Sequence, residues 1–202
     1  MTLDKKELRK EQHRLEILQA AEQLFARQGY HLTTMDSVAE ECGWSKGTLY
    51  LYFKNKEDLF FSILIEKMDR FSEALLNELS ASQGIEGKIS ALIDGQFSFL
   101  TSNKHFFQLV IAEQGKVMHS SDSGLREQLI NQQHNHVNKI SEALAAGMQD
   151  DSSIDPAILA GSIIGAVNLH QLNWLMSTDT VNIELIKNQI TSLFINGIRA
   201  HE

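Results

Sequence analysis

The chain has 202 residues, 43% of them apolar, which suits one large or two small globular domains. No run approaches 18 apolar residues, which excludes a membrane span, and a single cysteine excludes an intramolecular disulfide framework. The net charge of −8 argues against a nucleic-acid partner for the chain as a whole. The first residues lack the apolar core of a signal peptide, so we expect a cytoplasmic protein.

The charge is unevenly distributed along the sequence. Residues 1–60 hold nine Lys and Arg against ten Asp and Glu, a net of −1, whereas residues 61–202 hold nine against sixteen, a net of −7. The near-neutral segment can still bind DNA if its cations gather on one face. One proline and the lack of a clear strand alternation predict an all-α fold.

A first helix is predicted over residues 8–28, with apolar residues at helical spacing from Ile17 to Phe25 and an end near Gly29. The segment that leads into it, Lys5 to Arg14, mixes basic and acidic residues. It is either an arm that contacts phosphates or the minor groove, or a solvated helix start, and the second alternative is the commoner one.

Residues 33–56 predict two short helices joined by a tight turn and followed by the start of a third. Thr34 and Ser45 are good N-caps, and Gly43 supplies the left-handed backbone on which the first of these helices ends. Leu49 and Phe53 lie four residues apart and form one buried stripe. The spacing fits a helix-turn-helix whose second helix enters the DNA major groove, or an ordinary helical hairpin. Cys42, in the first of the two helices, is interpreted as a packing residue.

The residues around this turn resemble the DNA-binding domain of the TetR family of bacterial repressors. The resemblance covers roughly residues 10–60 and rests on Ile17–Phe25, Gly29-Tyr30, Thr33-Thr34, Ser45–Tyr50, Tyr52-Phe53 and Lys54–Phe60. It implies a three-helix DNA-binding domain over residues 1–55 and a larger helical domain for effector binding and dimerisation over residues 56–202. Trp44 departs from the family pattern, in which a smaller apolar residue is more common, and we expect it to pack between the motif helices.

The resemblance also assigns individual residues to the DNA contact. The residues that face base edges and nearby backbone are Lys46, Gly47, Thr48, Tyr50 and Leu51, and those that contact phosphates are Thr34, Tyr52 and Lys56. Ser45 completes the predicted DNA-binding set. Physical chemistry agrees in part, because lysine can reach guanine acceptors and hydroxyl groups donate to phosphates. Lys56 lies at the start of a predicted helix, where its positive charge gains little from the helix dipole, and a contact with a phosphate would explain its place there.

The rest of the sequence predicts further helices in an all-α second domain. They run over residues 56–81, 85–101 and 103–112, then for about 25 residues to Met148, with loops at 120–124 and 150–153. The helix over 56–81 begins beside the DNA-reading unit, so we interpret it as a lever between the domains. Asp155-Pro156 is a strong start for the next helix, and Asp179-Thr180 is predicted to cap the last one.

The last two predicted helices carry small or apolar seams. Ala157, Gly161 and Gly165 recur every four residues, and the final helix alternates Ile183, Ile186, Ile190, Leu193 and Gly197 in steps of three and four. Such seams could fill a single core or form half of a four-helix bundle across a two-fold axis. The resemblance implies the second arrangement and hence a homodimer.

Effector binding is predicted in the aromatic and methionine-rich interior of the second domain. Residue by residue such a pattern is more often plain core, yet binding pockets are mostly apolar with few polar groups. The predicted pocket residues are Phe107, Gln108, His170, Gln171 and Trp174. Because no cluster of buried cations is evident, we expect an apolar or aromatic effector.

Catalysis, cofactors and metals have no support in the sequence. None of the eight histidines forms an i, i+4 pair, and the letters of a nuclease signature at His134–His136 fall within a predicted helix. We therefore predict a homodimeric transcriptional repressor that binds a palindromic double-stranded operator and is released by a small hydrophobic or aromatic effector. The alternatives are an architectural DNA-binding protein without effector control, and an α-helical enzyme or sensor whose helix-turn-helix is vestigial.

Overall fold

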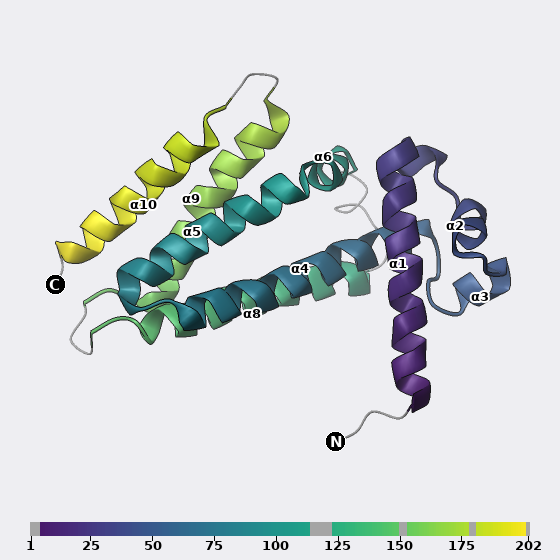
Figure 1. The fold of residues 1–202 in the computed structure, drawn as a ribbon, viewed down its shortest axis with the longest axis horizontal. Helices are drawn as coiled ribbons and strands as arrows, with labels where there is room; N and C mark the ends of the chain where they lie inside the picture. Colours follow the sequence, from purple (N-terminus) through teal and green to yellow (C-terminus); the bar gives the residue numbers. More distant parts are fainter. Residues whose placement is uncertain (1–4, 114–122, 150–152, 178–180, 201–202) are drawn as a thin grey trace. The chain divides into compact units, whose positions relative to one another are not determined.

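The computed structural model describes residues 5–113, 123–149, 153–177 and 181–200. All regular secondary structure in these ranges is helical, which confirms the predicted all-α class (Figure 1). No described helix is long and apolar enough to cross a membrane. The helices are α1 (Lys5–Leu32), α2 (Met35–Cys42), α3 (Lys46–Tyr50), α4 (Lys56–Ala81), α5 (Gly84–Ser102), α6 (Lys104–Ala112), α8 (Ser123–Ala145), α9 (Pro156–Met176) and α10 (Ile183–Arg199).

The chain divides into two compact units, Met1–Met68 and Asp69–Glu202. The division falls inside α4, which therefore contributes to both units. The boundary inferred from sequence lies between residues 55 and 56, at the start of the same helix, and it stays a prediction.

The first unit is built around α1, which is longer than predicted. Gly29 interrupts it with φ 80° and ψ 170°, so the predicted stop is a kink, and a last helical turn follows to Leu32. Phe25, Tyr30 and Phe60 pack their rings against one another, with centroids 5.2–5.6 Å apart, and all three are buried. These contacts hold α1 to the first turns of α4, and α2 and α3 complete the unit.

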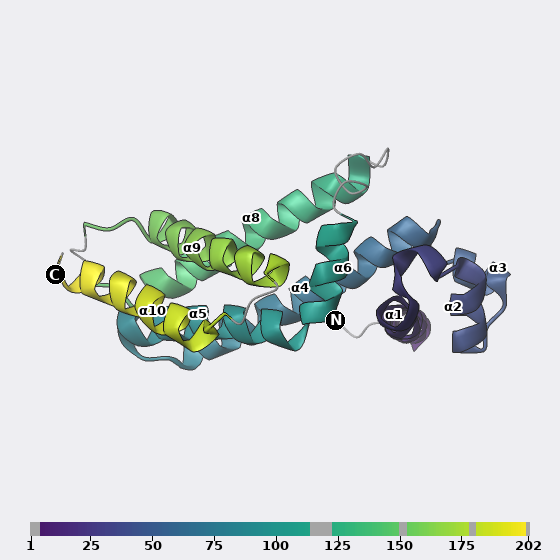
Figure 2. The same cartoon turned by 90° about the horizontal axis from the view of Figure 1, so that it is seen from above.

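The second unit has one apolar core shared by several helices. α5 packs against α9 and α10, and α8 packs against α9 and α5, as Figures 1 and 2 show. Aliphatic side chains fill the interior, with residues such as Ile89, Ile93, Ile140 and Ile163 fully buried. The second half of α4 joins this core through Leu75 and Leu79.

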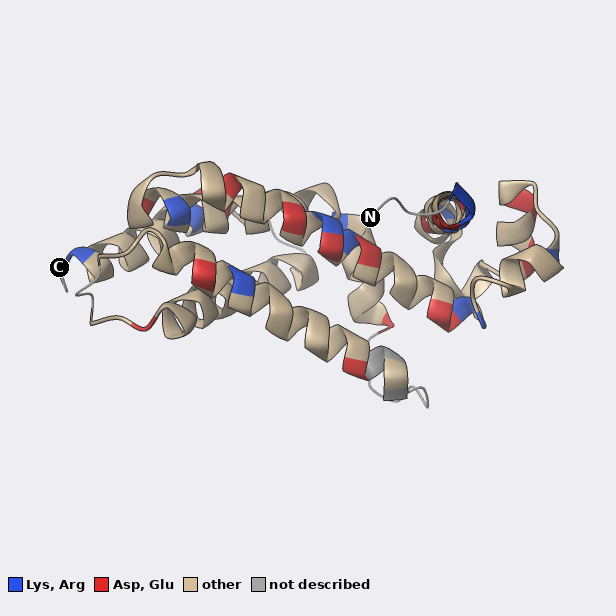
Figure 3. Ribbon diagram, turned by 90° about the horizontal axis from the view of Figure 1, so that it is seen from below, with Lys and Arg blue, Asp and Glu red and all other residues tan. Residues whose placement is uncertain are grey.

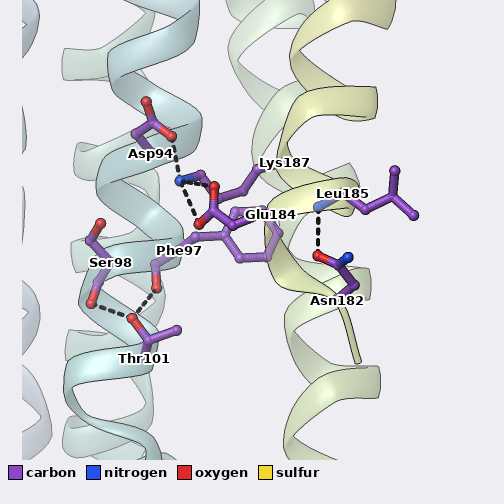
Figure 4. A network of polar contacts seen from close by, with 8 residues as sticks. All are labelled: Asp94, Phe97, Ser98, Thr101, Asn182, Glu184, Leu185 and Lys187. Atoms are coloured by element: carbon purple, nitrogen blue, oxygen red, sulfur yellow. Dashed lines mark hydrogen bonds and ion pairs between the residues drawn. The ribbon is translucent and has the colours of Figure 1, made fainter. Parts of the chain in front are cut away.

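Ion pairs tie α10 to α5 at two levels. Arg199 donates from Nε and an Nη atom to the two carboxylate oxygens of Glu86, at 2.6 and 2.7 Å. Near the start of α10, Lys187 lies between Asp94 of α5 (2.9 Å) and Glu184 of its own helix (3.2 Å), as Figure 4 shows. The hydrogen bond to Asp94 raises the pKa of Lys187, and that to Arg199 lowers the pKa of Glu86.

Helix caps confirm one predicted start and correct another. Asp155 accepts hydrogen bonds from the backbone N–H groups of Ala157 and Ile158 at 2.7 and 3.2 Å, so α9 begins as predicted. The predicted cap of the last helix by Asp179-Thr180 is wrong, because Asn182 Oδ1 caps α10. Residues 178–180 lie outside the described residues, as do 120–122 and 150–152 of the two predicted loops.

Candidate nucleic-acid interface and effector site

The turn between α2 and α3 is fixed by local hydrogen bonds. Thr34 Oγ1 accepts from the N–H of Ser37 (3.1 Å), and Ser37 Oγ accepts from the N–H of Thr34 (3.0 Å), which forms a capping box at the start of α2. At the other end, Gly43 has φ 69° and donates back to the carbonyls of Ala39 and Glu40. A side chain in this left-handed conformation would be strained, so glycine lets the chain reverse here.

The short helix α3 has one anchored face and one exposed face. Its N-cap, Ser45, accepts from the N–H of Thr48 at 3.1 Å. Leu49 is 0% exposed and Phe53 is 2% exposed, whereas Tyr50 is 46% exposed. The predicted burial of Leu49 and Phe53 and the predicted exposure of Tyr50 are therefore confirmed, although α3 ends at Tyr50 and Phe53 follows it.

The remaining residues of the exposed face lie beside Tyr50. Leu51 is 80% exposed, and Gly47 has open space around it, since the nearest atom to an added Cβ is Ser45 Oγ at 3.8 Å. Lys46 is exposed and pairs with Asp36 of α2 at 2.7 Å, and this hydrogen bond raises its pKa. A nucleic-acid acceptor that binds Lys46 has to compete with the Asp36 carboxylate.

Lys56 has protein partners that sequence reasoning missed. Its Nζ atom donates to the backbone carbonyls of Tyr30 (2.7 Å), Thr33 (2.8 Å) and His31 (3.3 Å) and lies 4.4 Å from the centroid of the Tyr30 ring. Carbonyls at the end of a helix lack intrahelical donors, and a cation there also suits the helix dipole. The place of Lys56 at the start of α4 is explained without a phosphate.

Trp44 contacts two aromatic side chains outside α2 and α3. Its ring meets His13 of α1 edge-on, with centroids 4.5 Å apart, and lies 6.2 Å from the ring of Tyr52. The Tyr52 hydroxyl in turn lies 3.5 Å from His13 Nδ1. Trp44 therefore joins α1 to the segment after α3, and it holds Tyr52 half-buried at the edge of the exposed face.

Basic residues gather at the start of α1. Lys5, Lys6, Arg9 and Lys10 lie exposed in its first two turns, and Figure 3 shows this blue end of the helix. Arg14 follows but pairs with Glu11 (3.1 Å) and Glu66 (3.4 Å). Both alternatives for this segment, a phosphate-binding arm and a solvated helix start, stay open.

The predicted effector residues come from α6 and α9, which pack together in the second unit. Gln108 Nε2 donates to the carbonyl of Leu175 at 3.3 Å, and Gln171 is 9% exposed. Phe107, His170 and Trp174 are half-buried. Lys104, whose Nζ atom lies 4.3 Å from the centroid of the Trp174 ring, was not identified from the sequence. Lys104 precedes the predicted pocket residue Phe107 by three positions, and this spacing could have indicated that the two lie on one helix face.

No metal centre is evident in the part of the chain that the structure describes, where no three His, Cys, Asp or Glu side chains come together. Cys42 is half-buried, and burial raises the pKa of its thiol, so its reactive thiolate is disfavoured. Its environment suits packing.

α9 presents a second apolar face that its own unit does not cover. Ile158 (69% exposed), Leu169 (58%), Leu172 (42%) and Met176 (67%) lie on this face, where side chains recur in steps of three and four. Gly161 and Gly165 belong to the same stripe, and no atom lies within 4 Å of a Cβ added at either. We call this set the α9 stripe.

The seam predicted on α10 is divided between two environments. Ile190 is buried, and Ile183 and Ile186 pack against the core of the second unit. Leu193 is 73% exposed, and Gly197 lies in open space. The final helix therefore fills its own core with one side and leaves apolar positions on the other.

Models of known families match most of the chain. Residues 17–63 match "Bacterial regulatory proteins, tetR family", and residues 64–197 match "YsiA-like protein, C-terminal region". Together the two matches span both compact units.

Individual relatives are similar over nearly the whole chain. The "Fatty acid metabolism regulator protein" of Bacillus subtilis is 27% identical over 91% of this chain and 94% of its own length. The crystal structure of the transcriptional regulator FadR from B. subtilis in complex with stearoyl-CoA has a TM-score of 0.72, at 26% identity, and covers 91% of this chain and 98% of that one. The fatty acid degradation regulator FadR from Bacillus halodurans has a TM-score of 0.71, also at 26% identity, over 94% and 97% of the two chains.

Proposed function

This chain belongs to the TetR family of bacterial regulatory proteins. We propose that it is a homodimeric repressor that binds a palindromic operator, and that a long-chain acyl effector releases the repressor from this operator. The chain is a helix-turn-helix, DNA-binding regulator of transcription. What we propose beyond this is a palindromic operator, repression rather than activation, a homodimer and an acyl effector. A cytoplasmic location belongs to it as well, since the regulator has to reach the chromosome.

The observation that carries the proposal is the two-sided packing of α3. Leu49 and Phe53 are buried beneath it, while Lys46 and Tyr50 stand on the exposed side. A recognition helix needs this arrangement, because its outer side chains must reach base edges while its inner ones fix its angle. Lysine reads guanine acceptors, and each good base contact discriminates by about 1–3 kcal/mol.

The DNA contact is proposed to use one coherent set of residues. The phosphate contacts come from the hydroxyl groups of Thr34 and Tyr52. The contacts to bases and nearby backbone come from Ser45, Gly47, Thr48 and Leu51. In this proposal Lys56 serves the site by fixing the end of α1, since its three carbonyl partners already take up its donors. The negative charge of the phosphates is then met by the exposed basic residues at the start of α1.

The homodimer is proposed to form through the α9 stripe and the exposed side of α10. Large apolar side chains at Ile158, Leu169 and Met176 face outward next to Gly161 and Gly165, where another helix can approach closely. A contiguous exposed apolar face on a regulatory protein marks an interaction surface. A two-fold axis there would relate two α3 helices, and half-sites about 34 Å apart would match them.

The effector is proposed to be a long-chain acyl compound bound by the second unit. The B. subtilis structure that resembles this chain was solved in complex with stearoyl-CoA. The apolar interior of the second unit and the aromatic side chains of Phe107 and Trp174 suit an acyl chain. An affinity change of roughly 5–150-fold for the operator is the usual size of such coupling.

A gel-shift titration tests this function. A duplex selected by the protein from random sequences is titrated with the protein, alone and with stearoyl-CoA or coenzyme A. We expect stearoyl-CoA to weaken operator binding by at least fivefold, and coenzyme A, which lacks the acyl chain, to leave it unchanged. Operator binding that does not respond to stearoyl-CoA would contradict the effector, and equal binding to random DNA would favour an architectural protein.

A further inference from the structure

Two glutamines of the second unit are buried without using the donors of their side-chain amides. Gln96 on α5 is 4% exposed, and Gln171 on α9 is 9% exposed. Among the residues that the structure describes, neither Nε2 atom has a hydrogen-bond partner. A buried donor without an acceptor destabilises a folded protein, so such groups are rare unless a ligand or a function uses them.

Each of these glutamines has an aromatic neighbour on its own helix face. Phe99 follows Gln96 by three residues on α5, and Trp174 follows Gln171 by three residues on α9. Side chains three apart in a helix lie next to each other on its surface. Both aromatic rings are half-buried. Each orphaned amide therefore lies beside a ring that can pack against an apolar ligand.

The helix α6 connects the two sites. The ring of Phe107 meets that of Phe99 edge-on with centroids 5.4 Å apart, and Lys104 Nζ lies 4.3 Å from the centroid of the Trp174 ring. Lys104 and Phe107 are themselves three apart, on one face of α6. Because the residues three positions after Gln96 and Gln171 contact neighbouring positions on α6, we place the two amides in the region where α5, α6 and α9 meet.

The hydrogen-bonding groups of the two glutamine amides indicate what kind of ligand atom would bind them. An amide N–H needs an acceptor, and a carbonyl oxygen has two lone pairs and therefore can accept from both glutamines. A neutral carbonyl suits this interior better than a carboxylate, whose charge would need a buried cation. Among the described residues of this unit, the buried Lys88 already donates to the carbonyl of Leu79, and the half-buried Lys104 lies over the ring of Trp174.

We propose that the side-chain amides of Gln96 and Gln171 donate hydrogen bonds to the thioester carbonyl oxygen of an acyl-CoA effector. This inference rests on the acyl effector proposed above. The acyl chain then packs among the apolar residues of the core, and the aromatic rings beside the two glutamines border the thioester. The two amides thereby make the site select a thioester over an alkyl thioether of equal chain length, which has no carbonyl oxygen.

Two probes that differ in one atom group test the assignment. Stearoyl-CoA is compared with its octadecyl thioether analogue, which keeps the chain and coenzyme A but lacks the carbonyl oxygen, by calorimetric titration of the full-length protein. We expect wild type to bind the thioester roughly 5–150-fold more tightly. Gln96→Leu and Gln171→Leu should each reduce this ratio towards one while keeping wild-type affinity for the thioether. Gln133→Leu, the same change on the exposed side of α8, should leave the ratio unchanged.

The outcomes separate this inference from the function on which it rests. Equal binding of both probes by wild type overturns the role of the two amides and leaves the acyl effector in place. Binding of neither probe overturns the acyl effector and this inference with it. Thermal unfolding of the ligand-free variants gives a second readout, because Leu in place of an orphaned donor should keep or raise Tm. A clear fall in Tm for both variants would show that the amides are bonded within the protein and would overturn the proposal.

Discussion

Replacing Lys56 by methionine separates two roles for a lysine at the start of α4. The amine donates to the carbonyls of Tyr30 and Thr33 at 2.7 and 2.8 Å, and to that of His31 at 3.3 Å. Methionine keeps an apolar stem of similar length but leaves these carbonyls without their donor. If Lys56 acts as a clamp, Lys56→Met lowers the stability of the first unit and leaves the number of phosphate contacts unchanged.

The size of the effect follows from the two short bonds. A hydrogen bond from a charged donor contributes about 1.5–3 kcal/mol, and partial exposure of the site reduces the sum, so we expect a loss of about 2–4 kcal/mol. Trp44 lies in the first unit and Trp174 in the second, and these are the two tryptophans of the chain. In a Trp174→Phe background, urea titration followed by tryptophan fluorescence therefore reports the first unit alone.

DNA affinity as a function of salt supplies the contrasting readout. Each phosphate contact contributes about 0.9 to the slope of log affinity against log salt concentration. We expect Lys56→Met to keep the wild-type slope, and Lys46→Met, which removes an exposed lysine of α3, to keep the urea midpoint. An unchanged midpoint together with a slope reduced by about 0.9 for Lys56→Met would refute the clamp and restore a phosphate contact.

Three further perturbations follow from the described contacts. Tyr50→Ala should weaken binding to a selected operator by about 1–3 kcal/mol while the free energy of unfolding changes by less than about 0.5 kcal/mol, because the side chain is 46% exposed; a stability loss of several kcal/mol would place Tyr50 in the core instead. Leu169→Glu, in the α9 stripe, should shift the protein to monomer in sedimentation velocity, and an unchanged dimer would remove this face from the interface. The Arg199 guanidinium lowers the pKa of Glu86 below the ordinary value of a glutamate, so the pair stabilises the fold above that ordinary pKa, and the gain disappears as pH falls through the lowered pKa. Arg199→Met should therefore reduce the loss of stability on acidification, and identical pH profiles would show that the pair contributes nothing.

The helix-turn-helix was predictable because its determinants are local. Thr34, Gly43 and Ser45 act within three or four residues of themselves, and the structure places them as N-cap, C-cap and N-cap. The same holds for Asp155 at the start of α9. Leu49 and Phe53 are buried as predicted, although α3 ends at Tyr50 and Phe53 follows it.

Contacts between distant residues were not predictable from the sequence. The carbonyl partners of Lys56 lie 23 to 26 positions earlier in the chain, so no local pattern indicates them. Likewise, the ring of Trp44 meets that of His13, a residue of α1 that is distant in the sequence. Asn182, rather than the pair Asp179-Thr180, caps α10, because several polar residues precede this helix and each is a possible N-cap on sequence alone.

The candidate effector region was predictable in part from the sequence. The aromatic character of Phe107 and Trp174 is readable from the sequence, and Gln171 was recognised as a polar residue beside them. Gln96 was not, because a glutamine on an apolar helix becomes informative only when its amide is found buried without an acceptor. Tertiary packing, rather than helical spacing, brings α5, α6 and α9 together.

Selection of bound fragments from random duplexes tests the central claim most directly, namely that α3 of two subunits reads a specific DNA sequence. We predict that the protein enriches one inverted repeat, with half-sites about 34 Å apart or a near multiple, and that stearoyl-CoA added during selection reduces the enrichment. Recovery of fragments without a common sequence, at any salt concentration that allows binding, would contradict it.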